Sequence, residues 1–312
     1  MWVLTGGAGY IGSHVSQAMV DAGFEVLILD NLSNGLESRV PKSAEFIKGD
    51  IRDESVVKKV LGRKNVVGVI NLAGLKSVEE SQLQPNLYFS VNFKGVSTIL
   101  NAAKKFGVRN FLQSSSAAVY GRSDSEFVSE KSICNPISVY GESKLLAENE
   151  INQFSLDGHG NVTSLRYFNV LGATSPILRD SSKANVLPKV LTEILAGRPP
   201  IVFGNDYPTR DGTCVRDYVH VADIARAHVL AASKMLREIL PQAINLGTGR
   251  GYSVYEVIRE VQRVKGTSYV PIVHSRRNGD APMLIAKTGL AKDALDFVAE
   301  FDLKQMVESA IG

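Results

Sequence analysis

A glycine-rich turn near the N-terminus constrains the fold more than any other feature of the sequence. Residues 2–5 form a short apolar run, Gly6, Gly9 and Gly12 follow it, and a segment with helical periodicity then extends to Ala22. Glycines at this spacing permit a tight turn, let the backbone approach a pyrophosphate and allow a helix to pack closely on a strand. The phosphates would lie at the N-terminus of that helix. The sequence therefore predicts a strand, a turn and a helix that together bind a dinucleotide.

A carboxylate ends the next apolar run, which covers residues 25–30. Asp30 lies 18 residues beyond Gly12, where a carboxylate can accept hydrogen bonds from the adenosine ribose hydroxyls. The same carboxylate would repel the 2′-phosphate of NADP. A structural alternative is that Asp30 only caps a turn, but the preceding glycines favour a role in binding. The sequence therefore predicts NAD rather than NADP as the cofactor.

Strand and helix patterns alternate along the first half of the chain. Residues 45–51 and 66–72 have the composition of buried strands, and each lies near a helical stretch. This alternation is typical of an α/β fold with a doubly wound parallel sheet, in which ligands bind at the carboxyl ends of the strands. The small residues Ala73 and Gly74 would let a cofactor lie against the sheet.

The alternation becomes irregular after Asn169, where glycine and proline mark several loops. We therefore expect two lobes, in which residues 1–169 form the nucleotide-binding domain and residues 170–312 a smaller α/β lobe. Residues 221–238 have helical periodicity. The segment from about 215 to 240 is expected to return to the first lobe.

Tyr140 and Lys144 are the strongest candidates for a catalytic pair. Residues four apart share one face of a helix, and among the ten tyrosines only Tyr140 has a lysine at that distance. A free phenol has a pKa near ~10, and a cation beside it favours the phenolate, which could exchange protons with a substrate hydroxyl. An exposed pair formed by chance would have no chemistry. The serines at positions 114–116 come one loop earlier and could point a hydroxyl into the same cleft.

Residues 86–106 are predicted to form one long amphipathic helix that contains Asn92. A polar residue at such a position is exposed, is a structural hydrogen-bond partner, or belongs to a site. The pattern leaves these alternatives open.

Charge and composition argue against several other classes of protein. The net charge is +3, and like charges occur only in short pairs, which is unlike a nucleic-acid-binding surface. The N-terminus has no secretion signal, and no apolar run is long enough to cross a bilayer, so a cytoplasmic protein is expected. The two cysteines and five histidines match no metal-ligand spacing, so we expect no metal site.

Together, the glycine turn, Asp30, the serine run and the Tyr140–Lys144 pair resemble the extended short-chain dehydrogenase/reductase superfamily. Within it the sequence is similar to the UDP-galactose 4-epimerases. The resembling segments are residues 5–31, 49–52, 73–76, 114–121, 140–144, 166–169 and 203–221. The last segment is the most specific to these epimerases. The resemblance implies a Rossmann-type sheet with a smaller C-terminal lobe for a UDP-sugar.

The resemblance also implies a role for each matching residue. Tyr140 would act as base and acid at the sugar's 4-hydroxyl beside Ser116, and Lys144 would hold the nicotinamide ribose and lower the pKa of the tyrosine. Cofactor contacts are implied at Gly6, Gly9, Tyr10, Ile11, Gly12, Asp30, Asn31, Asp50, Ile51, Leu72, Ala73, Gly74, Lys76, Asn92, Ser114, Tyr140, Lys144 and Tyr167. Substrate contacts are implied at Ser116, Asn169, Asn185, Val186, Phe203, Arg216, Arg277 and Asp280.

The implied activity is NAD-dependent epimerisation at carbon 4 of UDP-glucose and UDP-galactose. A preference for UDP-N-acetylglucosamine, or for both sugars, is an alternative, because Leu284 lies where the family varies side-chain size near the sugar's 2-position. Related dehydratases and decarboxylases carry an acid within positions 116–118, which this chain lacks. A non-catalytic NAD-binding regulator would be expected to lose Tyr140 and Lys144. The family also implies a homodimer.

Overall fold

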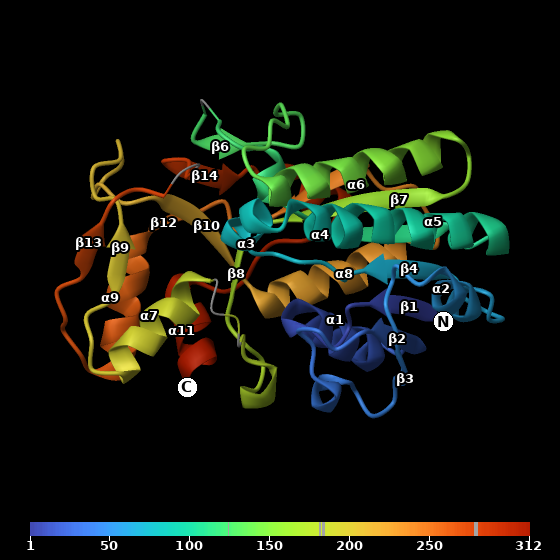
Figure 1. Ribbon diagram of the computed structural model, residues 1–312, viewed down its shortest axis with the longest axis horizontal. Coiled ribbons are helices and arrows are strands. Elements are labelled where there is room, and N and C mark those ends of the chain that lie inside the picture. Colours follow the sequence, from blue (N-terminus) through green and yellow to red (C-terminus); the bar gives the residue numbers. More distant parts are fainter. Residues whose placement is uncertain (124, 181, 183–184, 278–279) are drawn as a thin grey trace.

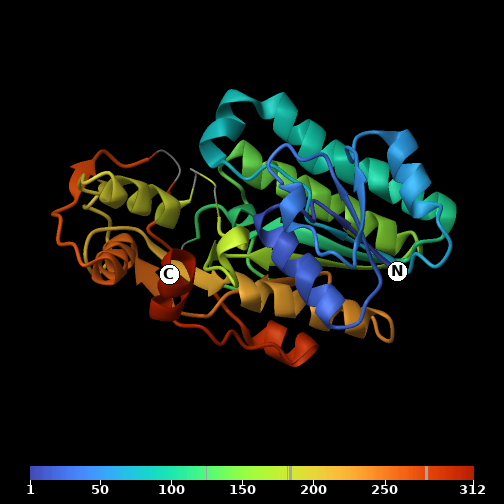
Figure 2. The same cartoon turned by 90° about the horizontal axis from the view of Figure 1, so that it is seen from below.

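The computed structural model describes residues 1–123, 125–180, 182, 185–277 and 280–312. Over these residues the chain forms a large parallel sheet with helices on both faces, and a smaller assembly of short strands and helices beside it (Figures 1 and 2). The α/β class and the doubly wound sheet predicted from the sequence are confirmed.

The large sheet has seven strands, and all neighbouring pairs are parallel. In order across the sheet they are β11 (Ala243–Leu246), β7 (Asn161–Tyr167), β5 (Asn110–Ser116), β4 (Gly68–Asn71), β1 (Trp2–Thr5), β2 (Val26–Asp30) and β3 (Glu45–Lys48). The chain builds outward in one direction from β1 to β3 and then in the other from β4. The crevice between the ends of β1 and β4 is therefore the topological switch point, where open α/β sheets bind ligands.

Two apolar cores hold helices against the two faces of this sheet. One face is covered by α2 (Glu54–Leu61), α5 (Gly95–Phe106) and α6 (Val139–Leu156), and the other by α1 (Tyr10–Asp21), α8 (Val221–Met235) and α10 (Gly289–Leu295) (Figure 2). Trp2, Leu4 and Ile28 are fully buried against the second set of helices. Both faces of the central strands are thus covered, which explains their nearly continuous apolar composition.

Two elements differ from the sequence prediction. Strand β3 is only partly buried, because it lies at the edge of the sheet and pairs with β2 alone. The expected single helix over 86–106 is instead α4 (Pro85–Phe89), a π-helical turn (Ser90–Lys94) and α5. The π-turn contains Asn92 and changes the direction of its side chain relative to a regular helix.

The smaller assembly contains a five-stranded sheet, a two-stranded sheet and three helices around a separate core. Its strands are β6 (Phe127–Val128), β8 (Asn169–Leu171), β9 (Ile201–Phe203), β10 (Val215–His220), β12 (Gly251–Ser253), β13 (Ile272–His274) and β14 (Met283–Ala286). Its helices are α7 (Val186–Leu195), α9 (Val254–Lys265) and α11 (Leu303–Ile311). Strand β10 leads directly into α8 on the large sheet, so the chain passes between the two assemblies at His220.

The remaining short helical segments lie in connections between strands. They are η1 (Glu37–Arg39), α3 (Val78–Leu83), η3 (Ala117–Val119) and η4 (Pro176–Leu178). Within the described ranges, none of the helices is both long and apolar enough to cross a bilayer.

The buried His228 on α8 makes the stability of the fold depend on pH. Its Nδ1 lies 2.8 Å from the carbonyl oxygen of Ile224, which can only accept, so Nδ1 carries the proton. Its Nε2 therefore accepts a hydrogen bond from the Tyr167 hydroxyl at 2.7 Å. Burial lowers the pKa of His228 to about 4, from an ordinary value of 6.5.

We expect His228 to weaken the fold below pH 6.5. The unfolded chain binds the proton first, so the contribution is constant above pH 6.5 and falls as the pH drops toward 4. At pH 5 the loss should be about 2 kcal/mol. Urea unfolding at pH 7 and pH 5 should show a smaller loss for His228→Gln than for the unsubstituted protein. Equal losses in the two proteins would contradict this account.

Candidate active site

The glycine turn forms a close-fitting backbone cradle at the end of β1. Gly6 has φ 72°, and a Cβ there would lie 2.5 Å from the Ala73 nitrogen. A Cβ on Gly12 would lie 2.0 Å from the Gly6 carbonyl oxygen. Helix α1 then begins at Tyr10, without a side-chain cap on its first amide groups. These free N–H groups and the absence of side chains suit a pyrophosphate, so the cradle fits a dinucleotide.

The carboxylate predicted to bind the ribose lies beside this cradle. Asp30 is buried at the end of β2, where it accepts hydrogen bonds from the Ala8 amide at 3.0 Å and the Leu32 amide at 2.8 Å. A second carboxylate, that of Asp50, accepts a hydrogen bond from Asn31 at 2.9 Å. Hydrogen bonds from Arg52 hold the pKa of Asp50 well below its usual range. Asn31 and Asp50 thus lie together, beside a buried Ile51.

Asn92 joins the end of β4 to the helix that carries Tyr140. Its side-chain oxygen accepts from the Leu75 amide at 2.8 Å, and its nitrogen donates to the Leu75 carbonyl and to Ser143, both at 3.0 Å. With 1% of its surface exposed, it is a structural hydrogen-bond partner. It fixes the loop at positions 72–76, in which a Cβ on Gly74 would lie 3.1 Å from the Lys144 ammonium.

Helix α6 brings the predicted catalytic residues together. Its first turn is capped by Ser138, which accepts from the Gly141 amide at 3.1 Å. Lys144, one turn after Tyr140, is buried and donates to the Ser114 carbonyl at 3.0 Å. Burial lowers the pKa of Lys144 to about 8, and the Glu148 carboxylate opposes this shift.

The electrostatic environment of Tyr140 differs from the prediction. Burial raises the pKa of its phenol, and a hydrogen bond with Ser116 opposes the rise. The sequence predicted a pKa lowered by Lys144. That prediction was wrong for the net shift, because the ammonium is directed to the Ser114 carbonyl while the phenol is enclosed.

A buried ion pair that sequence reasoning missed holds α6 against the sheet. Glu148 on α6 and Arg166 on β7 are both almost fully buried, and their closest atoms are 2.6 Å apart. Ser115 on β5 donates to the same carboxylate at 2.5 Å, and Arg166 donates to the Tyr120 hydroxyl at 2.9 Å. The available signal was the spacing, since Glu148 lies one helical turn after Lys144.

The residues predicted to bind the substrate line the smaller assembly. Arg216 on β10 lies 3.3 Å from Asp280. The guanidinium of Arg277 stacks 3.9 Å above the ring of Phe203. On the other wall, Asn185 is the N-cap residue of α7, which begins at Val186.

Asp180 connects this wall to the cofactor side, and Ser81 ties α3 to the catalytic helix. Asp180, which the sequence prediction missed, accepts from Asn185 at 2.5 Å and lies 3.5 Å from the Lys76 ammonium. Ser81 on α3 accepts from the Tyr140 amide at 3.2 Å. Tyr167 is buried at the end of β7, whereas Asn169 at the start of β8 is exposed. Asp180 therefore links Asn185 at the start of α7 to Lys76 in the loop after β4.

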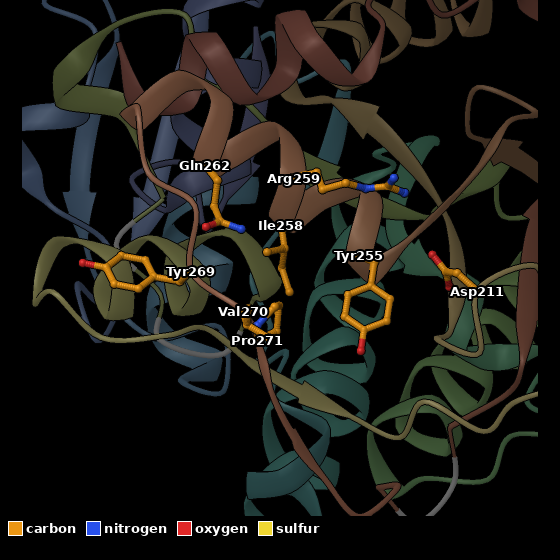
Figure 3. A pocket seen from close by; sticks show the side chains of 8 residues that line it. All are labelled: Asp211, Tyr255, Ile258, Arg259, Gln262, Tyr269, Val270 and Pro271. Atoms are coloured by element: carbon orange, nitrogen blue, oxygen red, sulfur yellow. The ribbon is translucent and has the colours of Figure 1, made fainter.

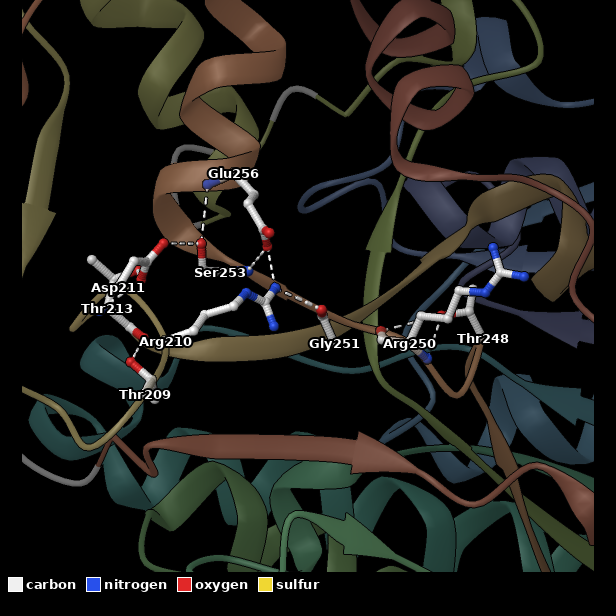
Figure 4. Close-up of polar contacts among 9 residues, drawn as sticks. All are labelled: Thr209, Arg210, Asp211, Thr213, Thr248, Arg250, Gly251, Ser253 and Glu256. Carbon is white, nitrogen blue, oxygen red and sulfur yellow. Dashed lines mark hydrogen bonds and ion pairs between the residues drawn. The ribbon is translucent and has the colours of Figure 1, made fainter.

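The most family-specific segment, residues 203–221, contains a turn anchored by polar contacts (Figure 4). Ser253 donates to Asp211 at 2.5 Å, and Thr209 donates to the Thr213 carbonyl at 2.6 Å. Arg210 pairs with Glu256 of α9. These contacts fix the turn to α9 and so position β10, which carries Arg216.

Two surface depressions of the protein have neither Tyr140 nor Lys144 in their lining. The first, of about 400 Å³, is lined by Asp211, Tyr255, Ile258, Arg259, Gln262, Tyr269, Val270 and Pro271 (Figure 3). It contains none of the residues predicted for either ligand. The second, of about 370 Å³, includes Tyr10, Asp180 and Leu187 and adjoins the glycine turn. In the part of the chain that the structure describes, no cluster of three His, Cys, Asp or Glu side chains could hold a metal.

The chain belongs to the NAD dependent epimerase/dehydratase family, whose model matches residues 2–247. NAD is accordingly its cofactor, as the sequence predicted. A UDP-glucose 4-epimerase from Streptomyces lividans is 42% identical over 299 residues, which are 94% of this chain and 90% of the relative. The predicted resemblance to this group of epimerases is confirmed.

Solved structures agree with this assignment. A crystal structure of a UDP-glucose 4-epimerase has a TM-score of 0.94 and 35% identity, over 99% of this chain and 95% of that one. The enzyme from Bifidobacterium longum, solved with NAD+ and UDP, has a TM-score of 0.92 and 33% identity, over 99% and 96% of the two chains.

Removing the charge of Glu148 should destabilise the protein strongly. Glu148→Gln leaves the buried Arg166 without its counter-ion, which typically costs about 3–5 kcal/mol. Glu142→Gln is a matched control, because Glu142 is exposed on the same helix. The control should change the free energy of unfolding by less than about 0.5 kcal/mol. Equal stabilities of the two variants in urea would refute the role given to the ion pair.

Proposed function

We propose that this protein interconverts UDP-glucose and UDP-galactose by inverting carbon 4 of the hexose. The observation that carries the proposal is the meeting of Tyr140, Ser116 and Lys144 at the carboxyl end of the sheet, beside the glycine cradle. The names of the relatives support the same substrate pair, in preference to an N-acetylated one.

In the proposed mechanism, Tyr140 removes the proton of the 4-hydroxyl. Ser116 stabilises the phenolate form through its hydrogen bond, and Lys144 supplies positive charge one helical turn away. Bound NAD supplies the redox chemistry by accepting a hydride from carbon 4 and returning it. Inversion follows when the hydride returns to the opposite face of carbon 4 and Tyr140 returns the proton to the 4-oxygen.

The change of face requires the hexose to turn while the nucleotide stays bound. We assign the nucleotide to Asn185, Val186, Phe203, Arg216, Arg277 and Asp280. Binding energy placed on the UDP group, away from the reacting carbon, would hold the intermediate while leaving the sugar few contacts. We assign Asn169 to contact with the hexose. Leu284 lies beside Arg216, because the two residues are paired in register between β14 and β10.

The cofactor contacts are assigned to the residues predicted from the sequence. The cradle at Gly6, Gly9, Tyr10, Ile11 and Gly12 would hold the pyrophosphate, and Asp30 the ribose. Residues 1–169 would form most of the NAD-binding domain. β11 and α10 also pack on the large sheet, so we assign them to this domain together with the part of the segment 215–240 that follows His220, whereas β10 belongs to the smaller assembly. A homodimer and a cytoplasmic location are supported by the family resemblance alone.

Two rival functions use the same fold. A dehydratase or decarboxylase would need an acid near Ser116, where this chain has alanines at positions 117 and 118. A non-catalytic NAD-binding regulator would not need Tyr140 and Lys144, which lie one turn apart on α6. Both features favour epimerisation.

Purified protein should convert UDP-glucose to UDP-galactose, and Tyr140→Phe should abolish nearly all of this turnover. We expect a loss of about 10²–10⁴-fold, because general acid–base catalysis is removed. The Kd for UDP-glucose, measured by calorimetry, should change little. Turnover of the N-acetylated pair is measured in parallel to rank the substrates. A protein that converts neither pair, or a Tyr140→Phe variant with full activity, would overturn the proposal.

A further inference from the structure

A carboxylate on α3 lies between two cations of the smaller assembly. Oε1 of Glu79 is 3.5 Å from Nε of Arg277 and 3.9 Å from Nζ of Lys189 on α7. Helix α3 lies beside the large sheet and α7 belongs to the smaller assembly (Figure 1), so these side chains connect the two. Neither Glu79 nor Lys189 was predicted from the sequence to contact a ligand.

We propose that Lys189 is a further ligand of the diphosphate group of the UDP-hexose, shared with Arg277, and that Glu79 is an internal carboxylate with which this diphosphate competes. This inference rests on the proposed function, because it assigns new residues to the same substrate site.

The position of Lys189 on α7 supports this role. Lys189 lies one turn after Asn185, so both side chains share one face of the helix. Asn185 makes no side-chain cap on this ten-residue helix, which leaves first-turn amide groups available to an anion. Lys189 therefore adds an ammonium group next to a site that already favours negative charge.

Arg277 lies ready to donate to an oxygen of the same group. Its guanidinium stacks over Phe203, which we assign to the nucleotide of the substrate. Its Nε is buried and makes no hydrogen bond within the described residues, although Oε1 of Glu79 is 3.5 Å away. A phosphate oxygen is the kind of acceptor that a stacked guanidinium can bind.

The charges of the cluster are unbalanced in favour of an anion. Two cations face one carboxylate, and the pKa of Lys189 is lowered by burial and by Arg277 while Glu79 raises it. A diphosphate carries more negative charge than Glu79, so it would stabilise the charged forms of Lys189 and Arg277 more than Glu79 does. Glu79 is 66% exposed, and partly exposed ion pairs of this length are weak. Its displacement by a ligand should therefore be easy.

The test is the affinity of the NAD-loaded full chain for UDP and for uridine, measured by titration calorimetry. Lys189→Met should weaken UDP binding about 3- to 10-fold, the range for a partly exposed charge contact, and leave uridine binding unchanged. Glu79→Gln should strengthen UDP binding by a similar factor. Lys304→Met, which alters an exposed lysine on α11, is the control and should change neither affinity.

Three results would overturn the inference. They are an unchanged UDP affinity in Lys189→Met, an equal loss of affinity for uridine, or weaker UDP binding in Glu79→Gln. If the unsubstituted protein does not bind UDP at all, the proposed function fails as well. If that protein epimerises UDP-glucose and binds UDP while the variants behave like it, only the role of Lys189 and Glu79 fails.

Discussion

The close approach of backbone at Gly6 and Gly12 is the constraint on which the site depends. A Cβ on either residue would overlap main-chain atoms, with Gly6 meeting the start of the loop after β4 and Gly12 meeting the Gly6 carbonyl. This contact sets the N-terminus of α1 against the ends of β1 and β4, at the switch point of the sheet. The cofactor site, the loop at positions 72–76 and the catalytic helix are all arranged around that point.

Burial then decides the electrostatics of the catalytic residues. It raises the pKa of Tyr140 and lowers that of Lys144 to about 8, so it disfavours the charged form of both groups. Ser116 and Glu148 oppose these shifts. Glu148 also anchors α6 through Arg166, so one buried carboxylate stabilises both the position and the charge of the site. The position and charge of Lys144 thus depend on Glu148 and Arg166, which are not among the residues assigned to the substrate.

Local patterns predicted much of this arrangement. The spacing of the glycines, the acid at the end of β2 and the separation of Tyr140 and Lys144 are short-range features, and a short stretch of sequence is enough to show them. The exposure of β3 depends on its edge position, and the π-turn at Asn92 depends on contacts with Leu75 and Ser143. Asp180, Glu79 and Lys189 each contact a residue that is far away in the sequence. No local pattern could therefore indicate that these three residues belong to the site. The net pKa shift of Tyr140 was missed for the same reason, because it depends on enclosure by distant segments.

The central claim is that the hydrogen at carbon 4 leaves as a hydride and returns to the same sugar. The direct test follows UDP-glucose labelled with deuterium at carbon 4 through conversion to UDP-galactose in ordinary water. The account predicts that the product keeps the deuterium at carbon 4, because transfer to NAD and back does not expose the label to solvent. Loss of the deuterium to water during conversion would show that carbon 4 is inverted by proton exchange, and would contradict the account.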